Sequence, residues 1–340
     1  MKCSKRSARP ADLRRASRPV VKPTLVFLAL AAASAAAQTT LRTQTNVVLV
    51  PTLVKDQRGE IVYGLQAKDF IIEDDGVEQL ARLDESPESQ PVSLVVAIQT
   101  GGRANYEFPR IRGLSSMLEP IVSQGHAKVA VVEFDSQIHA VHDFTSDADR
   151  IAQDLNGLQP GDGGAAVLDA VDFSIQLLEK APNQRERVLL LISETRDHGS
   201  RAAKIDDVVA EIGQSNVLVY ALAFSPALSN ILDTGRGNNI EEMHNGVNFI
   251  DLMFRARQAM RKNVPSAIAS MTGGEYEIFT TRKKFEVRAN DFTNHLYSRY
   301  LLSVEPKNPH PGLHQLKVRL REPASQAVLA RSSYWVQSSQ

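Results

Sequence analysis

The chain has 340 residues, 43% of them hydrophobic and 23% charged, which is typical of a globular protein with one large domain or two ordinary ones. Basic and acidic residues number 39 each, but eight of the basic residues and only one acid lie in residues 1–22. The rest of the chain keeps 31 basic and 38 acidic side chains, a net charge of about −7, which argues against nucleic acid or anionic lipid as a partner.

Residues 1–37 are predicted to be a secretory signal peptide. A basic segment precedes the apolar run Thr24–Ala33, and Ala35 and Ala37 give the small-residue pattern of a cleavage site near Ala37. The apolar run is short for a bilayer span, so a retained anchor is the less favoured alternative. The only cysteine, Cys3, lies in this segment, so the remaining chain has no disulfide. We therefore expect a secreted or periplasmic protein without a membrane span after cleavage.

Residues 41–85 are predicted to form a small β segment. The apolar runs expected to be strands are Val47–Val54, Ile61–Tyr63 and Phe70–Glu73. Pro51 cannot donate a ladder hydrogen bond, which favours an edge position for the first strand. The pair Asp75-Gly76 between apolar runs indicates a hairpin turn.

From residue 91 to about residue 290, apolar runs alternate with helical segments. The expected strands are Leu94–Ile98, Ala127–Phe134, Val188–Ile192 and Val217–Phe224. The expected helices are Tyr106–Val122, Asp147–Leu155, Ala166–Glu179, Ala202–Gln214, Phe249–Lys262 and Asp291–Tyr300. Continuous apolar strands are typical of a sheet buried on both faces. The alternation predicts an α/β fold: a doubly wound, mostly parallel sheet with helices on both faces.

The composition and hydrophobic pattern of the chain change again after this region. Residues 225–248 are rich in glycine and asparagine and are predicted to be an exposed loop. Residues 300–337 are predicted to be a second β segment, with strands at Leu301–Val304, Gln315–Leu320 and Val328–Val336. We expect this segment to pack with the amino-terminal one as a single β-rich accessory unit.

Four ordered motifs carry a resemblance to a known family. They are GLQAKDFIIEDDGVEQ (64–79), MTGGEYEIF (271–279), YSRYLLSVEP (297–306) and RSSYWV (331–336). Their order and spacing resemble those of the bacterial, acidobacterial-type von Willebrand factor type A-related proteins. The resemblance covers nearly the whole chain after the leader, and it implies a von Willebrand type A-like domain over about residues 91–290.

The resemblance also implies where a metal site would lie. Von Willebrand type A domains bind Mg²⁺ through D-x-S-x-S after the first strand, a threonine in a middle loop and an aspartate after the fourth strand. Those places fall here on Gln99, Gly101 and Arg103, then on Ala165, and then on Glu194. Mg²⁺ requires oxygen ligands, and the arginine stays charged and opposes a cation. We therefore expect a degenerate adhesion site, with no metal or other cofactor, in which Arg103 could pair with Glu194.

The remaining motifs give no support for catalysis. The sequence GDGG (161–164) lacks the following Lys-Ser or Lys-Thr of a phosphate-binding loop, and Ser193 lacks the flanking glycines of a nucleophile elbow. His139 with His142, and His310 with His314, are interpreted as scattered surface histidines, because no cysteine or carboxylate completes a zinc-type spacing. The acidic run Glu73–Asp75 is interpreted as a solvated hairpin end. We expect no catalytic residues.

These observations favour a noncatalytic interaction module over an enzyme. Its binding face would be three loops, Gln99–Asn105, Gly161–Ala165 and Glu194–His198, which would bind an unknown protein partner. The alternative is a structural or assembly protein of the cell envelope that uses its β edges or the loop over 225–248 for contacts.

Overall fold

The computed structural model describes residues 47–84, 91–123, 125–182, 185–224, 249–307, 309–322 and 326–337. The segments outside the described residues include the predicted leader with its cleavage position near Ala37, residues 85–90, and the predicted loop over 225–248. Residues 45–340 form one compact unit. In the part of the chain that the structure describes, no helix is long and apolar enough to cross a membrane.

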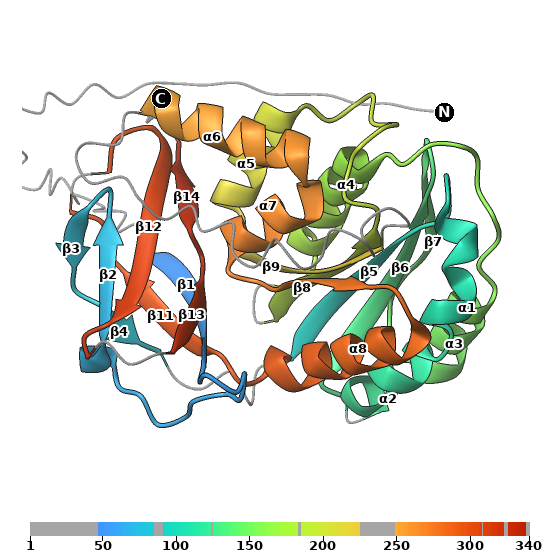
Figure 1. Ribbon diagram of the computed structural model, residues 1–340, viewed down its shortest axis with the longest axis horizontal. Helices are drawn as coiled ribbons and strands as arrows, with labels where there is room; N and C mark the ends of the chain where they lie inside the picture. The colour runs from blue at the N-terminus through green and yellow to red at the C-terminus, as the bar shows by residue number, and fades with distance from the viewer. Residues whose placement is uncertain are drawn as a thin grey trace, which may run out of the picture. The chain divides into compact units, whose positions relative to one another are not determined.

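A six-stranded sheet forms the centre of this unit, in the order β10-β9-β8-β5-β6-β7 (Figure 1). The strands are β5 (Val92–Gln99), β6 (Ala127–Phe134), β7 (Ile138–Thr145), β8 (Glu186–Ser193), β9 (Val217–Phe224) and β10 (Tyr276–Phe279). All neighbours are parallel except β6 and β7. Every residue of β5 and β9 is buried, which explains their continuous apolar sequences. The predicted doubly wound, mostly parallel sheet is confirmed.

Helices cover both faces of this sheet, as Figure 1 shows. One core lies under α4 (Val167–Glu179), α5 (Ile205–Gln214), α6 (Phe249–Lys262) and α7 (Val264–Thr272). A second core on the opposite face lies under α1 (Phe108–Ile111), α2 (Leu114–Ser123), α3 (Ala148–Asn156) and α8 (Arg282–Leu296). The two apolar cores hold the helices against the sheet, so that the loops following the parallel strands meet at the carboxyl edge of the sheet.

Some helix boundaries differ from the predicted ones. The single helix expected over Tyr106–Val122 is broken between α1 and α2, where Gly113 has a φ of 93°, outside the helical region. Helix α8 begins well before the expected Asp291, because the hydroxyl of Thr281 accepts a hydrogen bond from the Lys284 N–H at 3.2 Å and caps it. Helix α7 was not predicted from the sequence.

Two four-stranded antiparallel sheets contain strands from both flanks of the chain. Their orders are β13-β1-β11-β4 and β14-β12-β2-β3. The strands are β1 (Val48–Lys55), β2 (Phe70–Asp74), β3 (Val77–Gln79), β4 (Arg82–Leu83), β11 (Tyr300–Val304), β12 (Gly312–Leu320), β13 (Ala327–Ala330) and β14 (Ser333–Val336). A shared core that includes Val50, Phe70, Leu302 and Tyr334 lies between them. The division of the chain into two domains stays a prediction.

Three strand predictions were wrong in detail. Strand β1 is interior rather than an edge, but its pairing with β13 begins only at Thr52, after Pro51, so the missing N–H leaves that ladder intact. The run Val328–Val336 is divided at Arg331, and its two halves pair in different sheets. The expected strand Ile61–Tyr63 is reduced to a single bridge between Ile61 and Lys55.

Arg331 links the strand segments of the flanks to the central domain. Its guanidinium is buried, and it donates hydrogen bonds to the carbonyl oxygens of Ser333 at 2.8 Å and Gly213 at 2.7 Å, among others. These acceptors belong to β14 and α5. Burial lowers the pKa of Arg331 to about 10, so the side chain remains a cation at neutral pH.

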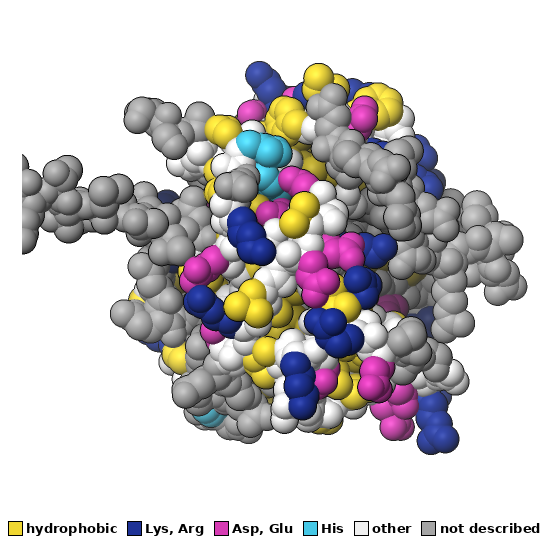
Figure 2. All heavy atoms as spheres, turned by 90° about the vertical axis from the view of Figure 1, so that its left-hand side faces the viewer, with side chains coloured by type: hydrophobic (Ala, Val, Ile, Leu, Met, Phe, Trp, Pro, Cys, Tyr) yellow, Lys and Arg dark blue, Asp and Glu magenta, His cyan; other side chains and the backbone are white. Residues whose placement is uncertain are grey.

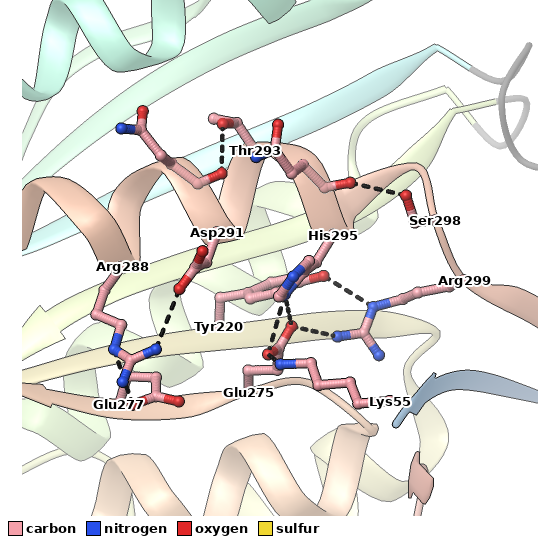
Figure 3. A network of polar contacts seen from close by, with 12 residues as sticks. Lys55, Tyr220, Glu275, Glu277, Arg288, Asp291, Thr293, His295, Ser298 and Arg299 are labelled. Atoms are coloured by element: carbon pink, nitrogen blue, oxygen red, sulfur yellow. Dashed lines mark hydrogen bonds and ion pairs between the residues drawn. The ribbon is translucent and has the colours of Figure 1, made fainter. Parts of the chain in front are cut away.

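A second buried link surrounds Glu275, which immediately precedes β10 (Figure 3). Its carboxylate contacts Lys55 Nζ at 2.5 Å, His295 Nδ1 at 2.9 Å and Arg299 Nη2 at 3.2 Å. Burial opposes ionisation, but the hydrogen bond from His295 and the charges of Arg299 and Lys55 together hold the pKa of Glu275 at about 2. Because Lys55 lies in β1 and His295 in α8, this network joins the amino-terminal flank to the central domain.

Candidate functional site

Three loops meet at the carboxyl edge of the central sheet. We call residues 99–105, 161–165 and 194–198 together the rim. The Gly161 N–H donates to the Thr100 carbonyl at 3.0 Å, and the Gly102 N–H donates to the Asp162 carbonyl at 2.7 Å, so the first two loops are joined through their backbones. The His198 N–H donates to the Ala165 carbonyl at 3.0 Å and attaches the third loop. This is the edge at which doubly wound folds present their ligand sites.

Gln99 and Glu194 hold the ends of β5 and β8 together. The amide oxygen of Gln99 accepts a hydrogen bond from the Glu194 N–H at 2.8 Å. The amide nitrogen of Gln99 donates to Glu194 Oε1 at 3.0 Å and to the Gly101 carbonyl at 3.1 Å. Gln99 is only 1% exposed, so both ends of its amide are committed to protein partners inside the rim.

Gly101 lies where only a glycine fits. A Cβ atom at this position would lie 2.1 Å from the Gly164 carbonyl oxygen and 2.6 Å from Asp135 Cβ. Both distances are far below an ordinary contact, and the first partner is backbone. A serine at residue 101 would require the loop around Gly164 to move away. Ala165, at the end of the same loop, is completely buried and exposes no polar side-chain atom.

Arg103 extends outward from the rim. Its backbone N–H donates to Glu194 Oε1 at 3.4 Å, but within the described ranges its guanidinium forms no ion pair with Glu194 or with another acid. The structure thus places Gln99, Gly101 and the Arg103 backbone beside Glu194, and leaves the arginine charge exposed. Tyr106, in the 3-10 turn that follows, is 71% exposed. An exposed arginine and an exposed tyrosine therefore lie close in sequence beside the rim.

Two aspartates order this region: Asp135, which the sequence analysis did not single out, and Asp162, which it considered only as part of the GDGG motif and of the predicted binding face. Asp135 Oδ2 accepts the Asp162 N–H at 3.1 Å, and Asp162 Oδ1 accepts the N–H groups of Ser136 at 3.0 Å and Gly164 at 2.8 Å. Hydrogen bonds from the Ser136 hydroxyl and from the Gly164 and Ser136 N–H groups lower the pKa of Asp162. The two carboxylates are thereby occupied in ordering the loops after β6 and α3. Each follows a strand or turn, and that position was the only signal in the sequence.

The donor set does not fit a Mg²⁺ ion held as the family holds it. Residue 99 presents an N–H₂ group toward Glu194, residues 101 and 165 have no side-chain oxygen, and residue 103 is a cation. Mg²⁺ demands a near-octahedral set of oxygen ligands. Of the five matched positions, Glu194 supplies a carboxylate, and its Oε1 already accepts two N–H groups.

Ser193 is not arranged as a nucleophile. Its side chain is fully buried, and its hydroxyl donates to the Glu194 carbonyl oxygen at 2.9 Å. The nearby His198 is 3.7 Å from Glu194 Oε2 and is exposed. A hydroxyl bound to a carbonyl and hidden from solvent lacks both the base and the access that acyl transfer requires.

The histidine pairs differ from each other. His139 lies 3.4 Å from Asp135, and the buried His142 lies 2.7 Å from Asp154, so these two have different partners. His310 and His314, in contrast, stack at 4.1 Å and share Asp75 as a partner. The interpretation as scattered surface histidines was wrong for His142, which is buried, and for the second pair, because the hairpin turn at Asp75 folds onto the start of β12.

The acidic run Glu73–Asp75 is also not a solvated hairpin end. Asp74 is 8% exposed and accepts hydrogen bonds from the Tyr334 hydroxyl at 3.0 and 3.1 Å. Burial raises the pKa of Asp74, against the opposing effect of the Tyr334 hydrogen bond. The turn itself was predicted correctly: Asp75 and Gly76 have φ values of 48° and 83° and join β2 to β3.

One family model and several solved structures are similar to parts of this chain. Residues 101–197 match the family model of the von Willebrand factor type A domain. No curated protein matches the chain. Among solved structures, an aerotolerance-related membrane protein from Bacteroides fragilis is 15% identical, with 60% of this chain and 99% of that chain covered and a TM-score of 0.41.

Two further solved structures are similar at the same level. The vWF domain of the type V pili tip protein Mfa5 from Porphyromonas gingivalis is 9% identical, with 62% of this chain and 97% of that chain covered and a TM-score of 0.41. Proximal thread matrix protein 1 from the mussel byssus is 12% identical, with 66% and 49% covered and a TM-score of 0.43.

The mostly parallel sheet, its two helical layers and the loops at its carboxyl edge define a von Willebrand type A fold. The chain matches the von Willebrand factor type A domain model over residues 101–197, which lie within the central domain. Its membership of the acidobacterial-type group stays a prediction.

Proposed function

We propose that this protein is a noncatalytic, extracytoplasmic interaction module that binds a protein partner through the rim without a bridging metal ion. The observation that carries the proposal is the reciprocal hydrogen bonding of Gln99 and Glu194, two of the positions that the resemblance assigns to ion ligands. The extracytoplasmic location rests on the predicted leader at residues 1–37.

The packing around Gly101 supports the absence of an ion. The backbone of the loop at Gly164 lies where a serine side chain would begin, so a ligand hydroxyl has no room at residue 101. The amide of Gln99 is already committed, and its N–H₂ group supplies the carboxylate of Glu194 with a hydrogen-bond donor in place of a cation. The rim is thus organised by N–H groups that donate to carboxylates and by close backbone contacts.

Arg103 supplies a positive charge with which the rim would bind. A metal-bridged domain offers its ion to an acidic side chain of the partner, and here an exposed guanidinium lies at a matching position. Guanidinium groups bind carboxylates in a bidentate manner, and arginine and tyrosine are enriched among the residues that dominate binding energy. Arg103 with Tyr106 would therefore bind a partner surface that presents an aspartate or glutamate.

The test compares three forms of the purified protein: wild type, Arg103→Glu, and Lys128→Glu as the matched control. Lys128 is exposed and lies near the start of β6, at the opposite edge of the sheet, so both variants change the net charge equally. Each form is immobilised and exposed to the envelope fraction of the source cells, and captured proteins are crosslinked and quantified by mass spectrometry.

The proposal expects one protein that wild type and Lys128→Glu capture equally and that Arg103→Glu captures at least about tenfold less. The crosslinked peptide of that protein should contain an acidic residue. Equal capture by all three forms would exclude the rim as the binding face, and would favour the assembly role that relies on sheet edges. Calorimetric titration with Mg²⁺ completes the test, because tight, one-to-one binding that Glu194→Gln abolishes would contradict the ion-free rim.

A further inference from the structure

Asp75, His310 and His314 form a compact cluster of potential metal ligands, remote in sequence from the rim. One ligand atom from each residue lies within 4.8 Å of the others. Asp75 Oδ2 is 2.8 Å from His314 Nδ1 and 3.6 Å from His310 Nε2. Figure 2, which views the β-rich side of the molecule, shows histidine side chains at the surface beside acidic ones.

The backbone fixes Asp75 in place. It is the one non-glycine residue in the described ranges with a positive φ, 48°, and its N–H donates to the Gln315 carbonyl at 2.9 Å. The Gln315 N–H in turn donates to Asp75 Oδ1 at 2.9 Å. One carboxylate oxygen is thereby held by β12, and the other is directed at both imidazoles. A group held in this way loses little freedom when it binds a ligand.

His314 is equally constrained. Its side chain is 2% exposed and stacks between His310 at 4.1 Å and Tyr334 at 4.7 Å. Its Nε2 lies 2.7 Å from the carbonyl oxygen of His310, an acceptor that requires a proton on Nε2. The neutral ring then has its lone pair on Nδ1, which faces Asp75 Oδ2. Two acceptors at 2.8 Å need a positive species between them, either a proton or a metal ion.

We propose that Asp75, His310 and His314 bind a divalent transition-metal ion, with Zn²⁺ as the best fit. Imidazole nitrogens and a carboxylate oxygen are the usual ligands of Zn²⁺, at about 2.0–2.2 Å. Adjacent ligands of a tetrahedral ion at such bond lengths are roughly 3.3 Å apart, so the 3.6 Å pair already fits and the 2.8 Å pair must open slightly.

The surroundings match those of a metal ligand. The hydrogen bond between His314 Nε2 and the His310 carbonyl is the kind of outer contact that orients ligating histidines. His310 has a side-chain exposure of 56%, so solvent or a partner side chain can reach the fourth coordination position. Asp74 Oδ1, 3.7 Å from His314 Nδ1, adds negative charge and favours a cation. The bound ion would join the β2–β3 turn to the start of β12.

The experiment uses the purified protein without a polyhistidine tag, freed of metal by a chelator and dialysed at pH 7.5. Zn²⁺ is titrated by calorimetry, and Co²⁺ is titrated by visible absorption as a reporter of coordination geometry. The variants are His310→Ala, which removes an exposed ligand, and Asp75→Asn. The control is His139→Ala, which removes an exposed histidine that also contacts a carboxylate but belongs to no compact cluster of three ligands among the described residues.

We expect one Zn²⁺ per chain with a dissociation constant in the micromolar range or below, and visible Co²⁺ bands of tetrahedral intensity. His310→Ala should weaken Zn²⁺ binding at least about tenfold, while His139→Ala should leave it unchanged. Circular dichroism checks that each variant is folded. If Asp75→Asn does not fold, the result for His310→Ala alone tests the proposal. No binding up to 1 mM Zn²⁺, or binding that His310→Ala leaves unchanged, would overturn the proposal and assign the cluster to an imidazolium–carboxylate pair.

Discussion

Gln99 and Glu194 exchange hydrogen bonds in both directions across the neighbouring strands β5 and β8, at 2.8 and 3.0 Å. The change Gln99→Glu keeps the shape of the side chain but replaces its N–H₂ donor with an oxygen that faces another carboxylate. We expect a loss of about 1–3 kcal/mol in the free energy of unfolding at pH 7. Urea denaturation measures it. The control Gln176→Glu makes the same change beside Asp172 on the exposed face of α4 and should cost less than about 0.5 kcal/mol. Equal losses for the two variants would show that the Gln99 contact contributes no more to stability than an exposed helix pair.

The close approach at Gly101 predicts a large difference between two glycines of the rim. Gly101→Ala would place a methyl group 2.1 Å from the Gly164 carbonyl and should destabilise the protein by about 1–3 kcal/mol or more. Gly163→Ala meets nothing within 4 Å and should be neutral or slightly stabilising. Thermal unfolding of the two variants provides the comparison. If both tolerate alanine equally, the loops are not packed as described.

Glu275 predicts a specific pH dependence. Its pKa in the folded protein, about 2, lies below its ordinary value of 4.5, so ionised Glu275 stabilises the protein above pH 4.5 and this stabilisation is lost as the pH falls toward 2. Glu275→Gln should therefore cost about 3 kcal/mol at pH 7 and progressively less below pH 4.5. Denaturation curves recorded between pH 3 and pH 8 measure the trend.

Glu277 supplies the matched control for that experiment. It lies in β10, and burial raises its pKa, against the opposing charge of Arg288. An acid whose folded pKa is raised destabilises the protein as the pH rises through that value, so Glu277→Gln should cost no more at pH 7 than at pH 3. Identical pH profiles for the two variants would contradict the assignment of the stabilising charge to Glu275.

Arg331 should resist even a conservative change. Its planar guanidinium satisfies several buried carbonyl oxygens at once, including those of Gly213 and Ser333, and lysine cannot reproduce that geometry. We expect Arg331→Lys to lower the free energy of unfolding by about 2–4 kcal/mol, because carbonyl groups would be left buried without donors. Arg319→Lys, on the exposed face of β12 beside Glu73, should cost less than about 1 kcal/mol in the same denaturation experiment. A cost for Arg331→Lys as small as this would show that the lysine finds other acceptors.

Much of the central fold could be predicted from the sequence because its signals are local. Strands β6 and β9 and helix α6 have the predicted bounds, since continuous apolar runs and helical periodicity do not depend on distant partners. The wrong predictions occur where contacts between residues far apart in the sequence determine the structure. Pro51 is tolerated in an interior strand because the pairing of β1 with β13 starts one residue later, at Thr52, and no local pattern contains that information.

The candidate site could likewise be predicted only where it depends on local sequence patterns. Gln99, Gly101 and Glu194 are brought together as the parallel strands require, but the exposed guanidinium of Arg103 depends on the route of its own loop. The cluster of Asp75 with His310 and His314 joins positions more than 230 residues apart. Only the pairing of β2 with β12 places them in contact, and spacing within either segment could not reveal it.

The pairing of β1 with β11 and β13, and of β2 with β12, has a consequence for how the protein is made. Among the described strands, β1 has no partner until the segments of β11 and β13 have been synthesised, and β2 has only the short β3 until β12 follows, whereas the central sheet can assemble from segments closer in sequence. Nascent β1 would therefore remain an unpaired, apolar strand, and β2 would keep one unpaired edge, a state prone to misassociation. A chaperone that shields these strands during synthesis would act at the step where the protein is most vulnerable.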